Sequence, residues 1–274
     1  MLKQVRTHTP WLLPLGLLGP FVLLLLVLLG WPLAILLWRS LQDGEGGFSL
    51  AGYFSILQRR RYFQAFINTV GLAIASTLLA LILCTPAAIY LERGKGWGRR
   101  ALAVMLTIPL SLPGIVIGFF IILNFGMTGV VPQLAEAATG DRQFQIAYSI
   151  WGLLLGYVYF QIPRVVLVVR GATASLSEDV IDVARTLGTP TWRLYSDIIL
   201  PTLRPALTNA ATLSLATALG AFGTAATLSR GFRVLPLEIA TAFTESFQPQ
   251  LAASMSIVLA SLTTVLLVGV RGKQ

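Results

Sequence analysis

The chain has 274 residues, of which 55% are hydrophobic and only 11% are charged, whereas soluble domains carry about a quarter charged residues. This composition argues against an ordinary soluble domain and predicts an all-α membrane protein. The net charge of +9 would suggest nucleic-acid binding in a soluble protein. In a membrane protein the distribution of basic residues over the loops is the informative part, and we expect no nucleic-acid partner.

Six largely uncharged runs follow one another along the chain, and a bilayer crossing takes roughly 20 apolar residues. The expected spans are residues 10–38, 66–91, 101–125, 146–169, 205–229 and 251–270. We expect residues 1–274 to form one transmembrane domain in contact with membrane lipid.

The first run could be mistaken for a secretory signal, because Lys3 and Arg6 precede it. The apolar core of a signal is about 7–15 residues long and ends at a cleavage site, whereas this run continues to Trp38 without such a site. We therefore expect it to remain as a membrane anchor.

The first external loop, residues 39–65, contains "SLAGYFSILQRRRYFQAF" with apolar residues at roughly helical spacing. Two readings stay open here, a helix along the membrane interface and a solvated loop. Within the spans, "TIPLSLPGIVIG" at 107–118 and "ALGAFGTAA" at 218–226 permit kinks and close helix contacts.

Basic residues indicate the orientation of the six spans. One side carries 12 of them, namely Lys3, Arg6, Arg93, Lys95, Arg99, Arg100, Arg170, Arg185, Arg193, Arg204, Arg271 and Lys273. The other side carries 7, namely Arg39, Arg59, Arg60, Arg61, Arg142, Arg230 and Arg233. Because cytoplasmic loops are enriched in lysine and arginine, we expect both termini and the loop between the fourth and fifth spans in the cytoplasm.

That loop, residues 172–201, is predicted to form two short amphipathic helices joined by an elbow. Ser175 and Glu178 have the spacing of a capping box, and an apolar helical stripe follows. The stripe consists of Leu176, Val180, Ala184 and Leu187. Gly188 ends this helix in the left-handed conformation, and Thr189 and Pro190 suit the start of the second helix.

Such an element can lie on lipid headgroups or insert an apolar face into a groove on a partner protein. The segment is net acidic, with Glu178, Asp179, Asp182 and Asp197 against Arg185 and Arg193. Since lipid surfaces favour basic segments, we expect a protein partner.

The segment resembles the cytoplasmic motif of permease subunits in bacterial ATP-driven (ABC) importers, which reads Glu-Ala-Ala, three residues, Gly, nine residues and Ile-x-Leu-Pro. Here the motif is Asp182-Val183-Ala184, Gly188 and Ile198-Ile199-Leu200-Pro201, with both intervals intact. Aspartate replaces the usual glutamate and valine the usual alanine. The continuation "TLRPAL" and "AFINTVGLAIASTLLALILCTPAAIYLERG" also resemble this family, and the likeness is greatest to permeases for polyamines, aminophosphonates and ferric ions.

The resemblance implies six transmembrane helices, a cytoplasmic coupling elbow between the fourth and fifth, and a place in the bacterial inner membrane. It implies that this chain forms half of a translocation path for a small polar solute, a polyamine or aminophosphonate before ferric ion. The implied partners are two copies of an ATP-binding subunit, a second, related permease and an extracytoplasmic solute-binding protein. ATPase docking then falls to Asp182, Ala184, Leu187, Gly188, Ile198, Leu200 and Pro201.

The sequence supplies no ATP chemistry of its own, since "ERGKGW" at 92–97 lacks the glycine and the Ser or Thr of a phosphate-binding loop. ATP and magnesium are therefore expected on the partner ATPase. We assign no catalytic, cofactor or metal residue: His8 is the sole histidine, and Cys84, the sole cysteine, is expected to be a buried apolar residue.

Polar residues inside the spans are candidates for the solute path, and they are Asn68, Asn124, Asn209 and Thr224. Each could instead form hydrogen bonds between helices. Arg164 should face protein or water, or extend to the cytoplasmic interface. The alternative function is an ion-gradient-driven secondary transporter, which the lack of Asp and Glu within the six runs disfavours because such transporters use buried ionisable groups.

Overall fold

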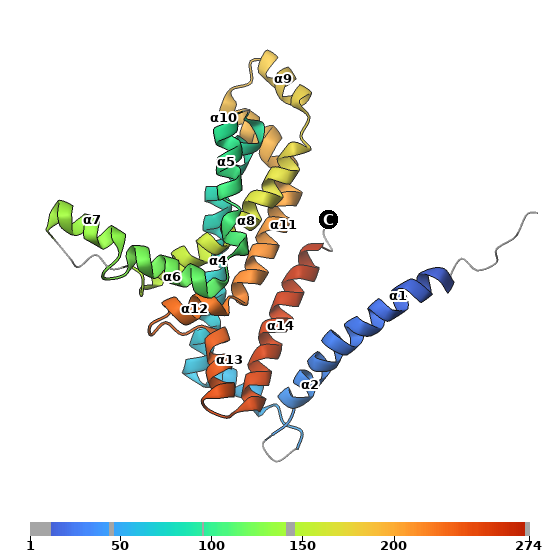
Figure 1. Ribbon diagram of the computed structural model, residues 1–274. Coiled ribbons are helices and arrows are strands. Elements are labelled where there is room, and N and C mark those ends of the chain that lie inside the picture. The colour runs from blue at the N-terminus through green and yellow to red at the C-terminus, as the bar shows by residue number, and fades with distance from the viewer. Residues whose placement is uncertain (1–11, 44–46, 95, 141–145, 272–274) are drawn as a thin grey trace, which may run out of the picture.

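The computed structural model describes residues 12–43, 47–94, 96–140 and 146–271. This part of the chain is helical apart from its loops and one isolated bridge between Gln42 and Phe48. Figure 1 shows a central group of long helices, with the first helix standing apart and a small helix at the top of the molecule.

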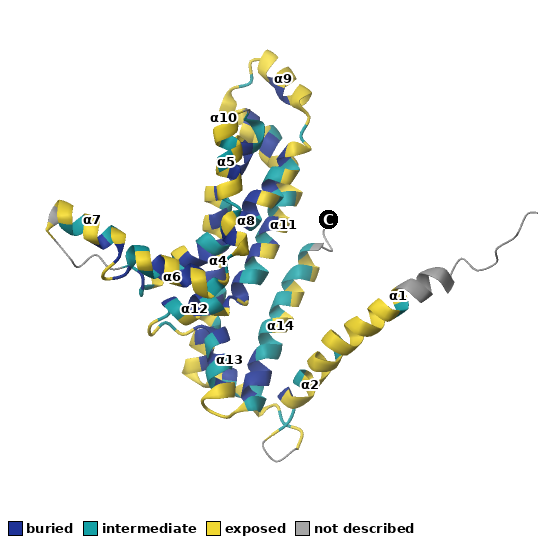
Figure 2. Ribbon diagram, viewed as in Figure 1, coloured by how far each residue is buried: buried dark blue, intermediate teal, exposed yellow. Residues whose placement is uncertain are grey.

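The first span is one continuous helix formed by α1 (Leu12–Leu25), η1 (Leu26–Gly30) and α2 (Trp31–Ser40). Figure 2 shows that most of its described residues are exposed. Its C-terminal end approaches α14 (Pro249–Arg271), where the Ser254 hydroxyl donates to the Ser40 carbonyl at 3.2 Å. A long apolar surface of this kind is suited to lipid or to another chain.

The loop expected over residues 39–65 does contain a helix, α3 (Ala51–Gln58). The backbone is extended at Arg59 and then enters α4 (Arg60–Arg93), which has 34 residues. At 1.5 Å per residue α4 is about 51 Å long, whereas the hydrocarbon core is about 30 Å thick. The expected span 66–91 lies inside α4, which is longer than one bilayer crossing requires.

The structure differs from the single span expected over residues 101–125. That run is divided into α5 (Trp97–Met105), η2 (Ile108–Ser111) and α6 (Gly114–Phe125), and α7 (Val130–Thr139) follows. Pro109 and Pro113 lie at the two breaks; each lacks an N–H group and disfavours helix in the residue before it. The candidate span in this region is Gly114–Ala138.

The fourth span is α8 (Ile150–Ala174), the most buried of the candidate spans. Ser149 caps it by accepting from the N–H groups of Trp151 and Gly152 at 3.2 and 3.3 Å, as serine commonly does. The helix starts four residues later than the expected span 146–169 and continues to Ala174, beyond the expected end. It packs against α4 and α11 (Leu200–Leu219).

The fifth span is bent. A continuous helix from Thr191 to Leu219 turns by 55° into α12 (Phe222–Leu228), so the expected span 205–229 covers two helices. A further helix that the sequence did not predict, α13 (Leu235–Thr244), precedes α14. α13 has 10 residues, too few to cross a bilayer.

The core lies between α4, α8 and α11. The buried residues there include Ala80, Ala88, Val165, Val166, Val169 and Leu203, and the two small alanines of α4 favour close helix packing. Within this packing the Gln161 amide of α8 donates to the Ser76 hydroxyl of α4 at 2.7 Å, a type of interhelical hydrogen bond common in membrane proteins.

The described residues include five helices long and apolar enough to cross a membrane, or six if the bent pair is one span. The predicted all-α membrane class is therefore confirmed, with five or six candidate spans. The candidate helices differ from the expected runs where proline or glycine breaks the helix.

Candidate functional site

Helix α9 (Glu178–Thr186) lies at the tip of the molecule between the fourth and fifth spans (Figure 1). The capping box expected at Ser175 is not formed, because α8 continues to Ala174 and Ser175 is the C-cap of that helix. The Ser175 backbone N–H donates to the carbonyls of Ala172 and Thr173. α9 begins three residues later, after Ser177.

α9 is apolar on two faces. Ile181 and Ala184 are buried in the same core cluster as Leu194 and Ile199, and they fix the helix to the base of the fifth span. Val180, Val183 and Leu187, spaced as one helical stripe, are exposed, and Leu187 retains 80% of its accessible surface. The stripe expected from the sequence is thus divided, with Ala184 facing the chain's own core and Leu187 facing outward.

Gly188 ends α9 in the left-handed conformation, with φ of +74°, as the sequence predicts. Its N–H donates to the Arg185 carbonyl at 2.9 Å, and the Thr189 N–H donates to the Ala184 carbonyl at 3.1 Å. These two bonds form a Schellman motif. A Cβ at this position would meet no atom within 4 Å, so the backbone conformation alone favours glycine here.

The chain does not form a second separate helix after Gly188. α10 (Thr191–Arg193) and the π-helical turn η3 (Leu194–Ile199) lead directly into α11. The wider turn comes just before Pro201, which cannot donate to the carbonyl four residues earlier. The elbow therefore connects to the fifth span through continuous helix.

The predicted docking residues occupy two levels of this elbow. Asp182 and Leu187 are exposed on α9, whereas Ile198 is partly buried and Leu200 and Pro201 are exposed at the base of α11. Asp182 lies 3.7 Å from Arg185, and both side chains are largely exposed, a pair worth about 1 kcal/mol or less. We did not predict from the sequence that Val183 is exposed beside Val180 and Leu187. The helical spacing of these three residues could have indicated it.

The four polar residues predicted for the solute path are not brought together. Asn124 donates to the Phe120 carbonyl of its own helix at 2.8 Å, and Asn209 is exposed on α11. Thr224 is buried, and its hydroxyl donates to the Gly114 carbonyl at 3.1 Å, joining α12 to α6. The fourth residue, Asn68, donates to the Arg233 carbonyl at 2.9 Å.

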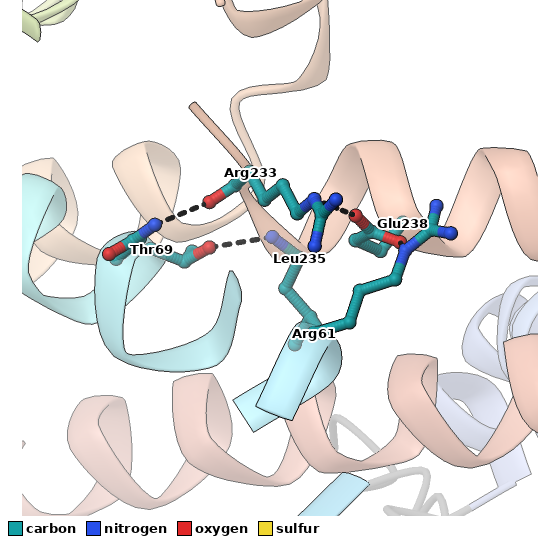
Figure 3. A network of polar contacts seen from close by, with 6 residues as sticks. Arg61, Thr69, Arg233, Leu235 and Glu238 are labelled. Atoms are coloured by element: carbon teal, nitrogen blue, oxygen red, sulfur yellow. Dashed lines mark hydrogen bonds and ion pairs between the residues drawn. The ribbon is translucent and has the colours of Figure 1, made fainter. Parts of the chain in front are cut away.

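Asn68 belongs to a polar network that ties α4 to the start of α13 (Figure 3). Arg61 Nε donates to Glu238 at 2.7 Å, and Arg233 lies 3.8 Å from the other oxygen of this buried carboxylate. Thr69 accepts from the Leu235 N–H at 2.7 Å. These contacts hold α4 and α13 together at one end of the helices, and Glu238 neutralises Arg61 of the "RRR" run.

The crossing of α6 and α12 depends on glycine. A Cβ on Gly223 would lie 2.8 Å from the Ile115 nitrogen, and one on Gly118 would overlap the Thr227 side chain. The close helix contacts expected from the two glycine-rich segments are therefore present.

A cavity of about 420 Å³ lies beside this crossing. It is lined by Gly114 of α6, by Phe160 and Arg164 of α8, and by the bend from Ala216 to Thr224. Arg164 donates to the Phe160 carbonyl, and its guanidinium lies 4.1 Å from the centre of the Phe160 ring. Of the four predicted path residues, Thr224 lines this cavity.

Residues 84–271 match the sequence model of a protein family, the binding-protein-dependent transport system inner membrane component. The matched region includes α8, the elbow and α14. The chain belongs to this family. It is thus a membrane transport permease, not a member of an enzyme class.

Relatives of the permease agree with this assignment. It is 31% identical over 211 residues to the molybdenum transport system permease protein ModB of Mycobacterium tuberculosis, covering 76% of this chain and 78% of ModB. It is 25% identical over 261 residues to the sulfate permease CysW of Synechococcus elongatus, covering 94% and 88%. The thiamine permease ThiP of Brucella abortus is 28% identical over 241 residues, covering 86% of this chain and 43% of ThiP.

Solved structures share the permease's fold. A bacterial alginate ABC transporter in complex with its periplasmic protein has a TM-score of 0.79 at 17% identity, covering 95% of this chain and 92% of that one. The MetNI methionine ABC transporter has a TM-score of 0.60 at 14% identity, covering 82% and 96%. None of these relatives supports the expected closest likeness to polyamine, aminophosphonate or ferric-ion permeases.

Proposed function

We propose that this chain is the permease subunit of an ATP-driven importer and forms half of its translocation path. The main support for this proposal is an exposed apolar stripe, formed by Val180, Val183 and Leu187, on a helix that packs against the chain's own core. A separate ATPase docks on this stripe within residues 175–201, and its movements reach the fifth span through the continuous helix that follows Gly188.

Energetics favour the apolar side chains as the source of docking affinity. Burying a valine or leucine side chain contributes roughly 1.5–3 kcal/mol, whereas the exposed Asp182–Arg185 pair contributes about 1 kcal/mol or less. The exposed carboxylates of Glu178, Asp179 and Asp182 surround the stripe, and they disfavour an anionic lipid surface as the partner. They can set the orientation of a protein partner.

The docking role extends to the other predicted residues in different ways. Ala184 and Ile198 pack within the permease and support the elbow, Gly188 sets its direction, and Leu200 and Pro201 begin the helix that receives the movement. Asp182 and Leu187 contact the ATPase directly.

The complete importer contains two copies of the ATP-binding subunit, which hold ATP and magnesium, and a second permease related to this chain. An extracytoplasmic binding protein delivers the solute. The alginate transporter, whose structure includes its periplasmic protein, supports this arrangement. Both termini and the elbow lie on the cytoplasmic side, as the distribution of basic residues favours.

The solute is a small oxyanion of the molybdate or sulfate type. Support comes from the molybdenum and sulfate permeases among the relatives. This assignment replaces the polyamine and aminophosphonate expectation.

Reconstitution into liposomes tests the proposal. The permease with its partner permease, ATPase and binding protein should import radiolabelled molybdate or sulfate only when ATP is supplied, and the permease chains without the ATPase should import neither anion. Uptake driven by an ion gradient without the ATPase would contradict the proposal and favour a secondary transporter.

A further inference from the structure

Arg164 lies well inside α8, and its side chain lines the cavity of about 420 Å³ at the bend between α11 and α12. A charged side chain inside a spanning helix is unfavourable in lipid and is normally paired or faces water. Its position therefore requires an explanation that packing alone does not supply.

Among the residues that the structure describes, no carboxylate lies within 4.0 Å of the Arg164 guanidinium. Its recorded contacts are with Phe160, through one hydrogen bond to the carbonyl and one contact to the ring face. A guanidinium has five N–H donors, so most of its hydrogen-bonding capacity is left for a ligand.

The rest of the cavity wall carries no charge. It consists of glycine, alanine and phenylalanine together with Thr217 and Thr224. Both threonine hydroxyls already donate to backbone carbonyls, at 3.0 and 3.1 Å, but each oxygen can still accept. The cavity is consequently positive, which attracts an anion and repels a polyamine or a metal cation.

We propose that Arg164 contacts the transported anion inside the membrane and selects a small oxyanion, an inference that rests on the proposed function. A guanidinium matches the oxygens of a tetrahedral oxyanion through two parallel hydrogen bonds. The anion serves as a transient counter-ion for Arg164. Because the site supplies a single charge on a partly buried side chain, the anion can also leave.

The location of the cavity links this contact to the transport cycle. Gly220 to Thr224 form both its wall and the bend of the fifth span, and that span begins at the elbow. A movement of the elbow that changed the bend would alter the wall facing Arg164, and so the access of the anion to it.

The test uses the assembled transporter, with its ATPase and binding protein, in proteoliposomes. The measured quantity is the number of molybdate or sulfate ions imported per ATP hydrolysed, at equal amounts of ATPase-bound permease. Arg164→Gln should lower this ratio by about tenfold or more, since a hydrogen bond to a charged group is commonly worth that much. Arg164→Lys, which keeps the charge but not the fork, should recover part of it.

Arg170→Gln is the matched control, because Arg170 lies on the same helix but is paired with Glu92 at 2.8 Å away from the cavity. It should leave the ratio of ions to ATP within about twofold of the unmodified transporter. That change is smaller than the one expected from losing a hydrogen bond to a charged group. If Arg164→Gln fails to reach the membrane, Arg164→Met carries the same test, since removing a charge from a spanning helix favours insertion.

An unchanged ratio in Arg164→Gln would overturn the role of Arg164 while leaving the proposed importer intact. Equal loss in the lysine and glutamine variants would also overturn it, because charge would then not be the deciding property. If the unmodified transporter imported thiamine or a polyamine but neither oxyanion, the proposed solute class itself would fail, and this inference with it.

Discussion

Gly188 controls the direction of the elbow at the scale of a single residue. Its φ of +74° disfavours any side chain with a Cβ, and a branched one costs about 1–2 kcal/mol there. The space around it is open, so Gly188→Val is not expected to clash. We predict that this variant inserts normally but loses most ATPase co-purification and uptake, because the Leu187 side chain then points away from the ATPase.

Gly188→Asn is the matched control, since asparagine tolerates the left-handed conformation better than other residues with a side chain. It should retain ATPase co-purification and uptake close to those of the unmodified chain. Equal loss in both variants, or none in Gly188→Val, would show that the conformation of Gly188 does not set the docking geometry.

Arg61 makes the shorter of the two contacts to the buried carboxylate of Glu238 (Figure 3). Arg61→Gln should lower the stability of the purified permease in detergent by about 1.5–3 kcal/mol, the range for a hydrogen bond to a charged group. Thermal unfolding measures this as a reduced melting temperature. Arg233→Gln, which removes only the 3.8 Å contact, should have a smaller effect, and the reverse order would contradict this account of the network.

At the scale of the element, α9 combines an inward and an outward apolar face within 9 residues. Val183→Asp changes the outward face, so we predict normal membrane abundance with at least tenfold weaker ATPase binding, since about 1.4 kcal/mol corresponds to tenfold and valine burial exceeds it. Co-purification from membranes measures both quantities. Asp182→Glu, which restores the commoner residue of the motif, should be tolerated.

Ile181→Asp is the contrasting variant, because Ile181 is buried in the core. A carboxylate placed there without a partner is strongly unfavourable, so this variant should lose abundance before docking can be assessed. If Val183→Asp lost abundance equally, the outward face would be a packing surface and the docking assignment would be wrong.

The two faces of α9 show what the sequence can predict about this site. Its spacing located the elbow, the glycine and the motif, since these depend on local backbone geometry. It could not separate Ala184 from Val183, because both are apolar and only the packing against Leu194 and Ile199 distinguishes them. The cavity at Arg164 was equally inaccessible, since its wall combines α6, α8 and the α11–α12 bend.

At the scale of the whole molecule, hydropathy predicted the spans where the backbone continues as a helix, as in α4 and α14. It failed over residues 101–125 because a transfer scale measures side chains and not backbone hydrogen bonding, which Pro109 and Pro113 interrupt. It also missed α13, whose 10 residues are too few to register as a span.

The orientation of the permease is a prediction at this same scale. With Cys84→Ala as background, a single cysteine at Thr191, beside the elbow, should react with a membrane-impermeant reagent only after the membrane is opened. A cysteine at Ser246, in the loop that joins α13 to α14 at the end of the molecule opposite α9 (Figure 1), should react in intact cells. Labelling of position 191 from outside would reverse the topology.

Crosslinking from the elbow in intact membranes tests the central claim, that an ATPase docks on α9. A photo-crosslinking residue at Leu187 and another at Phe247 form a matched pair, since the two side chains are 80% and 82% exposed. Leu187 follows α9 and Phe247 lies between α13 and α14, and these elements are at opposite ends of the molecule (Figure 1). In an assembled, transport-active complex we predict an adduct with the ATP-binding subunit from position 187 and none from position 247. An active complex that gave no such adduct from position 187, or gave it from position 247, would contradict the account.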